Sequence, residues 1–125
     1  MIVANYSKFK MDNSKIRVTV RKRPLTTREK KRNDFDTIVC DSNQTLCVKE
    51  TKQKVDLTKF IESHTFTFDQ IYDEHVSNEQ IYIDAVQPLV HAAFQKVKVT
   101  CFAYGQTGSG KTYTMMGEPD RPGLY

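Results

Sequence analysis

The most chemically specific segment of the sequence is Gly105–Thr112, which reads GQTGSGKT. It has the required residue at every defined position of the pattern GxxxxGK(S/T). The glycines let backbone N–H groups turn toward phosphate oxygens, Lys111 can reach the β- and γ-phosphates, and the hydroxyl of Thr112 can hold Mg²⁺. A helix that begins near Lys111 would add the positive end of its dipole. The segment therefore predicts a cradle for the phosphates of a nucleotide. The alternative is a glycine-rich turn with an incidental lysine.

Hydrolysis needs groups that the residues after Thr112 do not supply. A phosphate-binding loop of this kind also requires a carboxylate from a later strand, which holds the metal through water, and a group that orients the attacking water. The acids after Thr112 are Glu118 and Asp120, each beside a proline. The segment is too short for a crossover helix and a returning strand, which need about a dozen residues or more. From the residues alone we expect a phosphate cradle without a complete hydrolytic site.

Hydrophobic periodicity predicts the elements that must position this loop. The stretch 96–104 predicts a strand that leads into it, with a second half that is apolar on both faces, as in the buried middle of a sheet. A helix is predicted over 78–95, with Pro88 kinking or interrupting it. The other predicted strands are short and lie at 16–21, 37–40, 45–48 and 66–68.

Local signals predict the helix starts and the turns. The polar residues 41–44 suit a hairpin turn between two short strands, and the charged stretch 50–56 predicts an exposed loop. The spacing of a capping box occurs at two places: Thr26 with Glu29, and Ser77 with Gln80.

The composition indicates one globular segment rather than a disordered chain, with 38% hydrophobic and 27% charged residues among 125. Residues 1–14 are polar and aperiodic, which predicts a flexible leader. Residues 15–125 are predicted to form the folded part. No apolar run approaches the length of a membrane span or a signal core, so we expect a protein of the cytosol or nucleus without a membrane partner. The spacing of the cysteines and histidines argues against a disulfide scaffold or a structural zinc site.

Basic residues concentrate in the stretch 15–32, which contains a single acid, Glu29. Such a cluster attracts acidic partners such as nucleic acid, anionic lipid, an acidic protein surface or a nucleotide phosphate. The alternative is a solvated face on a strand and a short helix. The cluster alone identifies no partner.

Read as a whole, the string FAYGQTGSGKTYTM at 102–115 resembles the P-loop of kinesin motor domains. Upstream, RKRP at 21–24 resembles the family's RxRP segment, and FTFDQIY at 66–72 resembles its FxFDxxF segment. The resemblance implies an α/β P-loop NTPase fold with a central, mainly parallel sheet flanked by helices. Residues 15–125 would be the N-terminal part of that motor domain, since the family's switch motifs NxxSSR and DxxGxE lie further on.

The resemblance also implies a chemistry and its residues. It implies ATP and Mg²⁺ as cofactors and a parent protein that is a microtubule-stimulated ATPase, whereas we expect no turnover from this chain alone. Arg21, Arg23 and Pro24 would pack on the adenine, with Tyr113 stacked on its other side. Lys111 would be the catalytic residue and the Thr112 hydroxyl the metal ligand. The phosphates would be bound by Gly105, Gln106, Thr107, Gly108, Ser109, Gly110, Lys111 and Thr112.

A narrower resemblance concerns KVDLTKF at 54–60, which is similar to a loop of the kinesin-13 class, the kinesins that depolymerise microtubules. It implies that Lys54, Val55 and Asp56 contact tubulin, and that the parent protein acts on microtubule ends of the cytoplasmic cytoskeleton, including the spindle. The alternative for these residues is an ordinary exposed charged loop.

Three other functions stay open from the sequence. The chain could be a catalytically inactive fragment that binds nucleotide or tubulin. It could belong to a nucleic-acid-associated P-loop ATPase, although its aromatic residues do not interleave with the basic cluster as a stacking platform requires, so no nucleic acid is expected. A small GTPase is disfavoured because the phosphate-binding loop is preceded by more than 100 residues and no NKxD motif follows.

Overall fold

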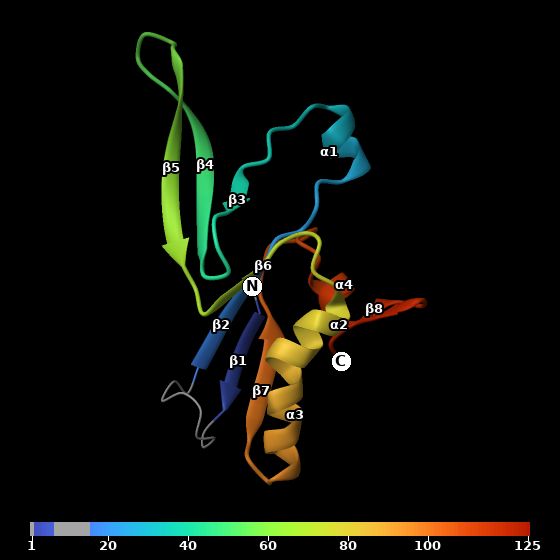
Figure 1. Ribbon diagram of the computed structural model, residues 1–125. Helices are drawn as coiled ribbons and strands as arrows, with labels where there is room; N and C mark the ends of the chain where they lie inside the picture. Colours follow the sequence, from blue (N-terminus) through green and yellow to red (C-terminus); the bar gives the residue numbers. More distant parts are fainter. Residues whose placement is uncertain (1, 7–15) are drawn as a thin grey trace.

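The computed structural model describes residues 2–6 and 16–125, which form a mixed α/β structure (Figure 1). The strands are β1 (Ile2–Tyr6), β2 (Ile16–Arg21), β3 (Ile38–Cys40), β4 (Thr45–Gln53), β5 (Lys59–Thr67), β6 (Gln70–Tyr72), β7 (Val99–Ala103), β8 (Gly117–Glu118) and β9 (Arg121–Pro122). The helices are α1 (Thr27–Lys31), α2 (Asn78–Ile81), the π-helical turn η1 (Tyr82–Val86), α3 (Gln87–Phe94) and α4 (Lys111–Met115).

The main sheet has the strand order β6-β2-β1-β7. Strand β2 runs parallel to β6, but β1 runs antiparallel to both β2 and β7. The expectation of a mainly parallel sheet is therefore wrong for the described strands. The reason is that β1 lies between β2 and β7 in the opposite direction, and so reverses both of its pairings.

Strand β1 also corrects the expectation of a flexible leader over 1–14. Ile2–Tyr6 is hydrogen-bonded on both edges, with Val3 opposite Val18 in β2 and opposite Phe102 in β7. Two neighbouring strand edges can satisfy the backbone N–H and C=O groups of a short segment that shows no amphipathic pattern of its own. Residues 1 and 7–14 of the predicted leader lie outside the described residues.

Strand β7 confirms the predicted strand before the phosphate-binding loop, but not its burial. Among the described strands β7 pairs with β1 alone and forms an edge of the sheet. Its residues alternate between half-buried and exposed, and Phe102 is 47% exposed. The second apolar face of the sequence 99–103 therefore has no strand or helix over it in the described part of the chain.

The predicted helix over 78–95 is confirmed as one helical run made of α2, η1 and α3. Pro88 lies in the first turn of α3, directly after η1, where the missing N–H of proline falls at a change in helical pitch. The run starts where the Ser77 hydroxyl accepts a hydrogen bond from the Gln80 backbone N–H at 3.2 Å. Ile81 is fully buried and packs with Tyr72, Ala85, Val86 and Leu124 in the core. This packing fixes α2 beside the ends of β2 and β6.

A second sheet, ordered β3-β4-β5, extends away from the main sheet as a long hairpin (Figure 1). The predicted hairpin of strands near 37–40 and 45–48 is confirmed by the antiparallel pairing of β3 with β4. The exposed loop expected over 50–56 is wrong for 50–53, which continue β4 opposite β5. A strand that is exposed on both faces carries polar residues at every position. Its sequence therefore lacks the apolar–polar alternation that identifies a half-buried strand, and it resembles a loop.

Within the described part of the chain, no helix has both the length and the apolar character needed to span a membrane.

Candidate functional site

The phosphate-binding loop joins the end of β7 to the start of α4 (Figure 1). Gly108 and Gly110 have φ angles of 81° and 91°, a region that costs other residues backbone strain. At Gly105 an added Cβ would lie 2.5 Å from the Ser109 Oγ. The shape of this loop therefore requires glycine at 108 and 110 and disfavours a larger residue at 105, and α4 begins at Lys111, as predicted.

The amine of Lys111 lies across the loop. Its Nζ donates hydrogen bonds to the backbone oxygens of Gly105 at 2.6 Å and Gln106 at 2.9 Å. Thr112, the predicted metal ligand, is exposed at the start of α4. The two carbonyl oxygens accept hydrogen bonds from the ammonium group, as phosphate oxygens could. Lys111 is therefore held over the phosphate-binding loop.

Arg21 is turned toward Tyr113. The guanidinium carbon lies 5.1 Å from the centre of the Tyr113 ring, whereas a base between the two groups would need about 7 Å, twice an optimal contact distance. In this structure Arg21 and Tyr113 therefore contact each other directly, and their predicted packing on opposite faces of the adenine stays a prediction. Arg21 is drawn inward because it donates hydrogen bonds to the side-chain oxygens of Asn78 and, at 3.0 Å, of Thr114. Burial lowers the pKa of Arg21 from its ordinary value.

Arg23 is held by Glu29, the one acid of the basic stretch. The two guanidinium nitrogens lie 2.8 and 3.1 Å from the Glu29 carboxylate oxygens. The same carboxylate accepts a hydrogen bond from the Thr26 backbone N–H at 2.6 Å, and the Thr26 hydroxyl accepts one from the Glu29 N–H, which confirms the predicted capping box of α1. The hydrogen bond from Arg23, followed by those from Thr26, lowers the pKa of Glu29 to about 2.

A groove brings the predicted base-contacting residues together. Arg21 at the end of β2, with Arg23 and Pro24 in the segment after it, lines the groove together with Gly110 and Tyr113 of the loop and α4. Its volume is about 1040 Å³, at the upper end of the roughly 300–1,000 Å³ of small-molecule sites. A smaller hollow shares these five residues and is also lined by Ser109 and Lys111. The arrangement therefore offers flat and apolar surfaces directly beside a phosphate cradle.

Several cations of the basic stretch are paired with acids. The Lys22 amine lies 2.7 Å from Asp36 and 3.1 Å from Glu74, and Arg32 lies 2.7 Å from Asp34. Burial opposes the charge of Lys22, but its hydrogen bonds to Asp36 and Glu74 raise its pKa overall. These pairs reduce the free positive charge that an acidic partner could contact.

The predicted tubulin-contacting residues form the tip of the β4–β5 hairpin. The turn is closed by a backbone hydrogen bond from Lys54 to Thr58 at 2.9 Å, and Val55 is fully exposed. The Asp56 carboxylate accepts hydrogen bonds from the hydroxyl and the N–H of Thr58, which lower its pKa. The Lys54 amine lies 5.8 Å from the centre of the Phe60 ring. The exposure predicted for Lys54, Val55 and Asp56 is confirmed. They lie in the hydrogen-bonded turn of a hairpin rather than in a long loop.

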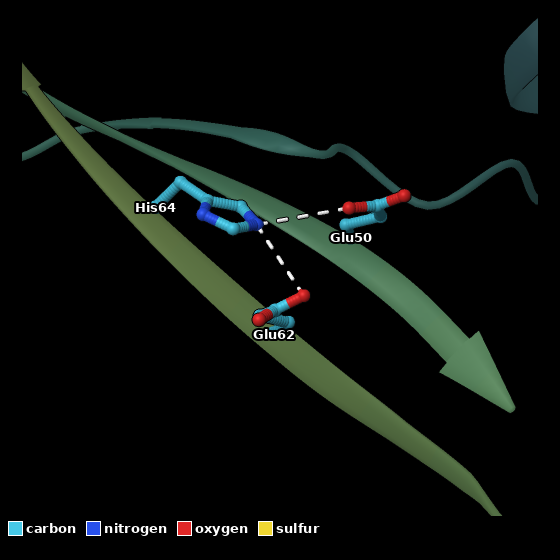
Figure 2. A group of neighbouring side chains, drawn as sticks. All are labelled: Glu50, Glu62 and His64. Carbon is cyan, nitrogen blue, oxygen red and sulfur yellow. Dashed lines mark ion pairs between the residues drawn. The ribbon is translucent and has the colours of Figure 1, made fainter. Parts of the chain in front are cut away.

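A charged cluster lies on one face of this hairpin (Figure 2). Glu50 and Glu62 are opposite each other across the strands, and His64 Nε2 lies 3.7 and 3.5 Å from their carboxylates. These groups could ligate a divalent cation, but the Lys52 ammonium contacts both carboxylates and provides positive charge between them. Only the strand register brings the four residues together, so the cluster could not be predicted from the sequence.

Sequence reasoning also missed two buried polar residues beside Arg21, namely Asn78 and Thr114. Nothing in their sequence context separates them from surface residues, since Asn78 follows a helix-capping serine and Thr114 lies in a short polar run.

Comparisons with known proteins identify the family of the chain. The kinesin motor domain family matches residues 21–125. Kinesin-like protein KIN-13B of Arabidopsis thaliana is 54% identical over 106 residues, which cover 85% of this chain and 15% of that protein. KIN-13A of Oryza sativa subsp. japonica is 52% identical over 108 residues, covering 86% of this chain and 13% of that protein.

A third relative, Kinesin-like protein KIF24 of Mus musculus, is 50% identical over 111 residues, which cover 89% of this chain and 8% of that protein. The chain thus spans 15% or less of the length of these three relatives. The chain belongs to the kinesin motor domain family, and its relatives include kinesins of the KIN-13 group.

Proposed function

We propose that this chain is the N-terminal, nucleotide-binding part of an ATP-dependent microtubule motor of the kinesin-13 type. The observation that carries the proposal is the groove in which Arg23 and Pro24 lie with Tyr113 beside the Gly105–Thr112 loop. These residues are far apart in sequence, so an incidental glycine-rich turn would not account for their meeting. The similarity to KIN-13A and KIN-13B supports the choice of class.

Each residue of the site has a proposed role. Lys111 exchanges the carbonyl oxygens of Gly105 and Gln106 for phosphate oxygens, since both satisfy its ammonium group. The glycine backbone of the loop, with Gln106, Thr107 and Ser109, cradles the phosphates, and the Thr112 hydroxyl holds Mg²⁺, which neutralises phosphate charge when bound.

The base is proposed to enter the groove from its open side, against Arg23, Pro24 and Tyr113. A guanidinium, a pyrrolidine ring and a phenol all present flat or apolar faces to a purine. Arg21 supports Tyr113 from behind, through the ring contact at 5.1 Å.

The tip residues Lys54, Val55 and Asp56 are proposed to contact tubulin when the motor depolymerises microtubule ends in the cytoplasm. Their exposure, which is complete at Val55, and the closed turn that holds them support this role. No nucleic-acid or membrane partner is proposed, and the pairing of Lys22 and Arg32 with acids agrees with that view.

We propose that hydrolysis requires a metal-holding carboxylate that this segment does not supply. Glu118 in β8 and Asp120 in the turn after it are the acids that follow α4 in the described residues. A short strand pair does not place a carboxylate behind the metal as a neighbouring strand of the main sheet would. The chain alone then binds nucleotide without turnover.

The proposal is tested by nucleotide binding and turnover in parallel. Titration of a motor-length protein that contains this chain with a fluorescent ATP analogue in the presence of Mg²⁺ should show saturable binding, and the same protein should show microtubule-stimulated ATPase activity. Absence of nucleotide binding to the motor-length protein would refute the nucleotide site. Binding without microtubule stimulation in the motor-length protein would favour an inactive nucleotide-binding protein instead.

A further inference from the structure

One buried side chain joins three walls of the nucleotide groove. Asn78, the first residue of α2, is 7% exposed. Its Oδ1 accepts a hydrogen bond from Arg21, while its Nδ2 donates to the backbone oxygens of Tyr113 at 3.3 Å and Pro122 at 3.0 Å. Asn78 therefore connects the end of β2, helix α4 and strand β9 through a single amide group.

The contact to Arg21 matters because that cation is held by neutral partners. Besides Asn78, Arg21 donates to the Thr114 hydroxyl at 3.0 Å and to the backbone oxygen of Val76 at 3.2 Å. A half-buried guanidinium is stable only while its N–H groups are satisfied. Loss of the Asn78 oxygen would free Arg21 to leave its position against the Tyr113 ring.

The contact to Tyr113 acts on the same ring from the backbone. The Nδ2 of Asn78 fixes the Tyr113 carbonyl, and Arg21 lies against one face of the ring. Tyr113 also lines the open groove with Arg23 and Pro24. The oxygen of the Asn78 amide, through Arg21, and its nitrogen, directly, therefore both restrain the aromatic residue against which a base would pack.

We propose that Asn78 is a positioning residue for the base of the bound nucleotide. It holds Arg21 and Tyr113 as a preformed pair and leaves contact with the base to Tyr113, Arg23 and Pro24. This inference rests on the proposed nucleotide site and adds to it a residue that determines base-dependent affinity. The phosphate cradle is built separately by Gly105–Thr112, so Asn78 has no direct part in phosphate binding.

Two substitutions distinguish the acceptor oxygen of the Asn78 amide from its donor nitrogen. Asn78→Ala removes every hydrogen bond of the side chain. Asn78→Asp keeps an acceptor for Arg21 but loses the donor, and it places a carboxylate against the carbonyl oxygens of Tyr113 and Pro122. The matched control is Gln80→Ala, which changes an exposed residue of the same helix whose side chain bonds Asp84 rather than the groove.

The experiment compares ATP with inorganic tripolyphosphate, which carries the phosphates without the base. Each competes against a fluorescent ATP analogue for a motor-length protein that contains this chain, and the ratio of the two affinities measures base recognition. We expect this ratio to fall about tenfold in Asn78→Ala, the loss typical of a buried hydrogen bond. A similar fall is expected in Asn78→Asp, and none in Gln80→Ala.

The outcomes distinguish this inference from the function on which it rests. An unchanged ratio in both Asn78 variants, or equal weakening of both ligands, would overturn the positioning role. If Asn78→Ala fails to fold, as circular dichroism would show, the ratio in Asn78→Asp decides. A parent protein that binds neither ATP nor tripolyphosphate would instead overturn the nucleotide site itself.

Discussion

At the scale of single residues, the site depends on cations whose charges are already engaged. Lys111 bonds two carbonyl oxygens of its own loop, Arg23 bonds Glu29, and Arg21 bonds neutral oxygens. Each cation is therefore restrained before a ligand arrives, which limits the ordering that binding must still supply.

Replacement of Lys111 tests the phosphate site most directly. In a motor-length protein we expect Lys111→Ala to abolish ATP turnover, because its charge opposes the negative charge on the transferring phosphate. Steady-state ATPase assays would measure this loss, with the surface variant Lys30→Ala as the control. Turnover near the parent rate in Lys111→Ala would remove Lys111 from the site.

Thr112 should act through the metal. We expect Thr112→Ala to raise the Mg²⁺ concentration needed for nucleotide binding, because a hydroxyl ligand is lost, whereas Thr112→Ser keeps it. Binding of a fluorescent ATP analogue across a Mg²⁺ titration compares the two. Superimposed titrations of Thr112→Ala and the parent would contradict the ligand role.

The pKa of Glu29 predicts a pH dependence. It is lowered from 4.5 to about 2, so the folded protein favours the ionised form, and the stabilisation is present above the ordinary pKa. It is lost as the pH falls from 4.5 through about 2. Thermal melts of Glu29→Gln and the parent across this range should show a smaller pH slope in the variant. Equal slopes would mean that Arg23 and Thr26 do not stabilise the Glu29 carboxylate in solution.

At the scale of elements, the β4–β5 hairpin holds its tip far from α4 and from the end of β7 (Figure 1). The tip residues are exposed, and the strand register places the charged cluster of Glu50, Lys52, Glu62 and His64 between them and the base of the hairpin. Cross-strand pairs of opposite charge stabilise such a two-stranded ribbon. The tip can therefore change without disturbing the groove.

Replacement of Lys54, Val55 and Asp56 together by alanine tests the tip. We expect the melting temperature and nucleotide affinity to stay nearly unchanged, because no buried side chain is lost. Microtubule shortening by the motor-length protein at saturating ATP should collapse, since the charge-assisted contacts to the partner are gone. Unchanged shortening would contradict the tubulin-contacting role, and a large fall in melting temperature would show that the tip is packed.

At the scale of the whole molecule, the described chain leaves an apolar surface on the main sheet. Val86, Leu89, Val90, Phe94 and Cys101 line an open hollow between α3 and β7, and Phe94 and Phe102 are exposed. The outer edge of β7 carries no partner among the described strands. Such an edge beside apolar side chains favours association between chains.

We therefore expect residues 1–125 in isolation to be poorly stable and to aggregate. Phe94→Lys should reduce aggregation, because Phe94 is exposed and its replacement removes apolar surface without creating a cavity. Size-exclusion chromatography and thermal melts of both proteins would measure this. A parent chain that elutes as a monomer and melts sharply would contradict the prediction.

The sequence by itself determined the features that short stretches encode. The glycines of Gly105–Thr112 define the loop, Thr26 and Glu29 define the start of α1, and the periodicity of 78–95 defines the helical run. The string 102–115 also identified the family. Each signal lies within about five turns of helix or one loop, so neighbouring residues suffice to produce the structure.

The tertiary structure alone decided how distant segments meet. The direction of β1, the length of the β4–β5 hairpin and the contact between Arg21 and Tyr113 all depend on partners far along the chain. Asn78 gives no local sign that it will be buried against β2, α4 and β9. Strand pairing and buried polar contacts are set by register and packing across the fold, which periodicity does not encode.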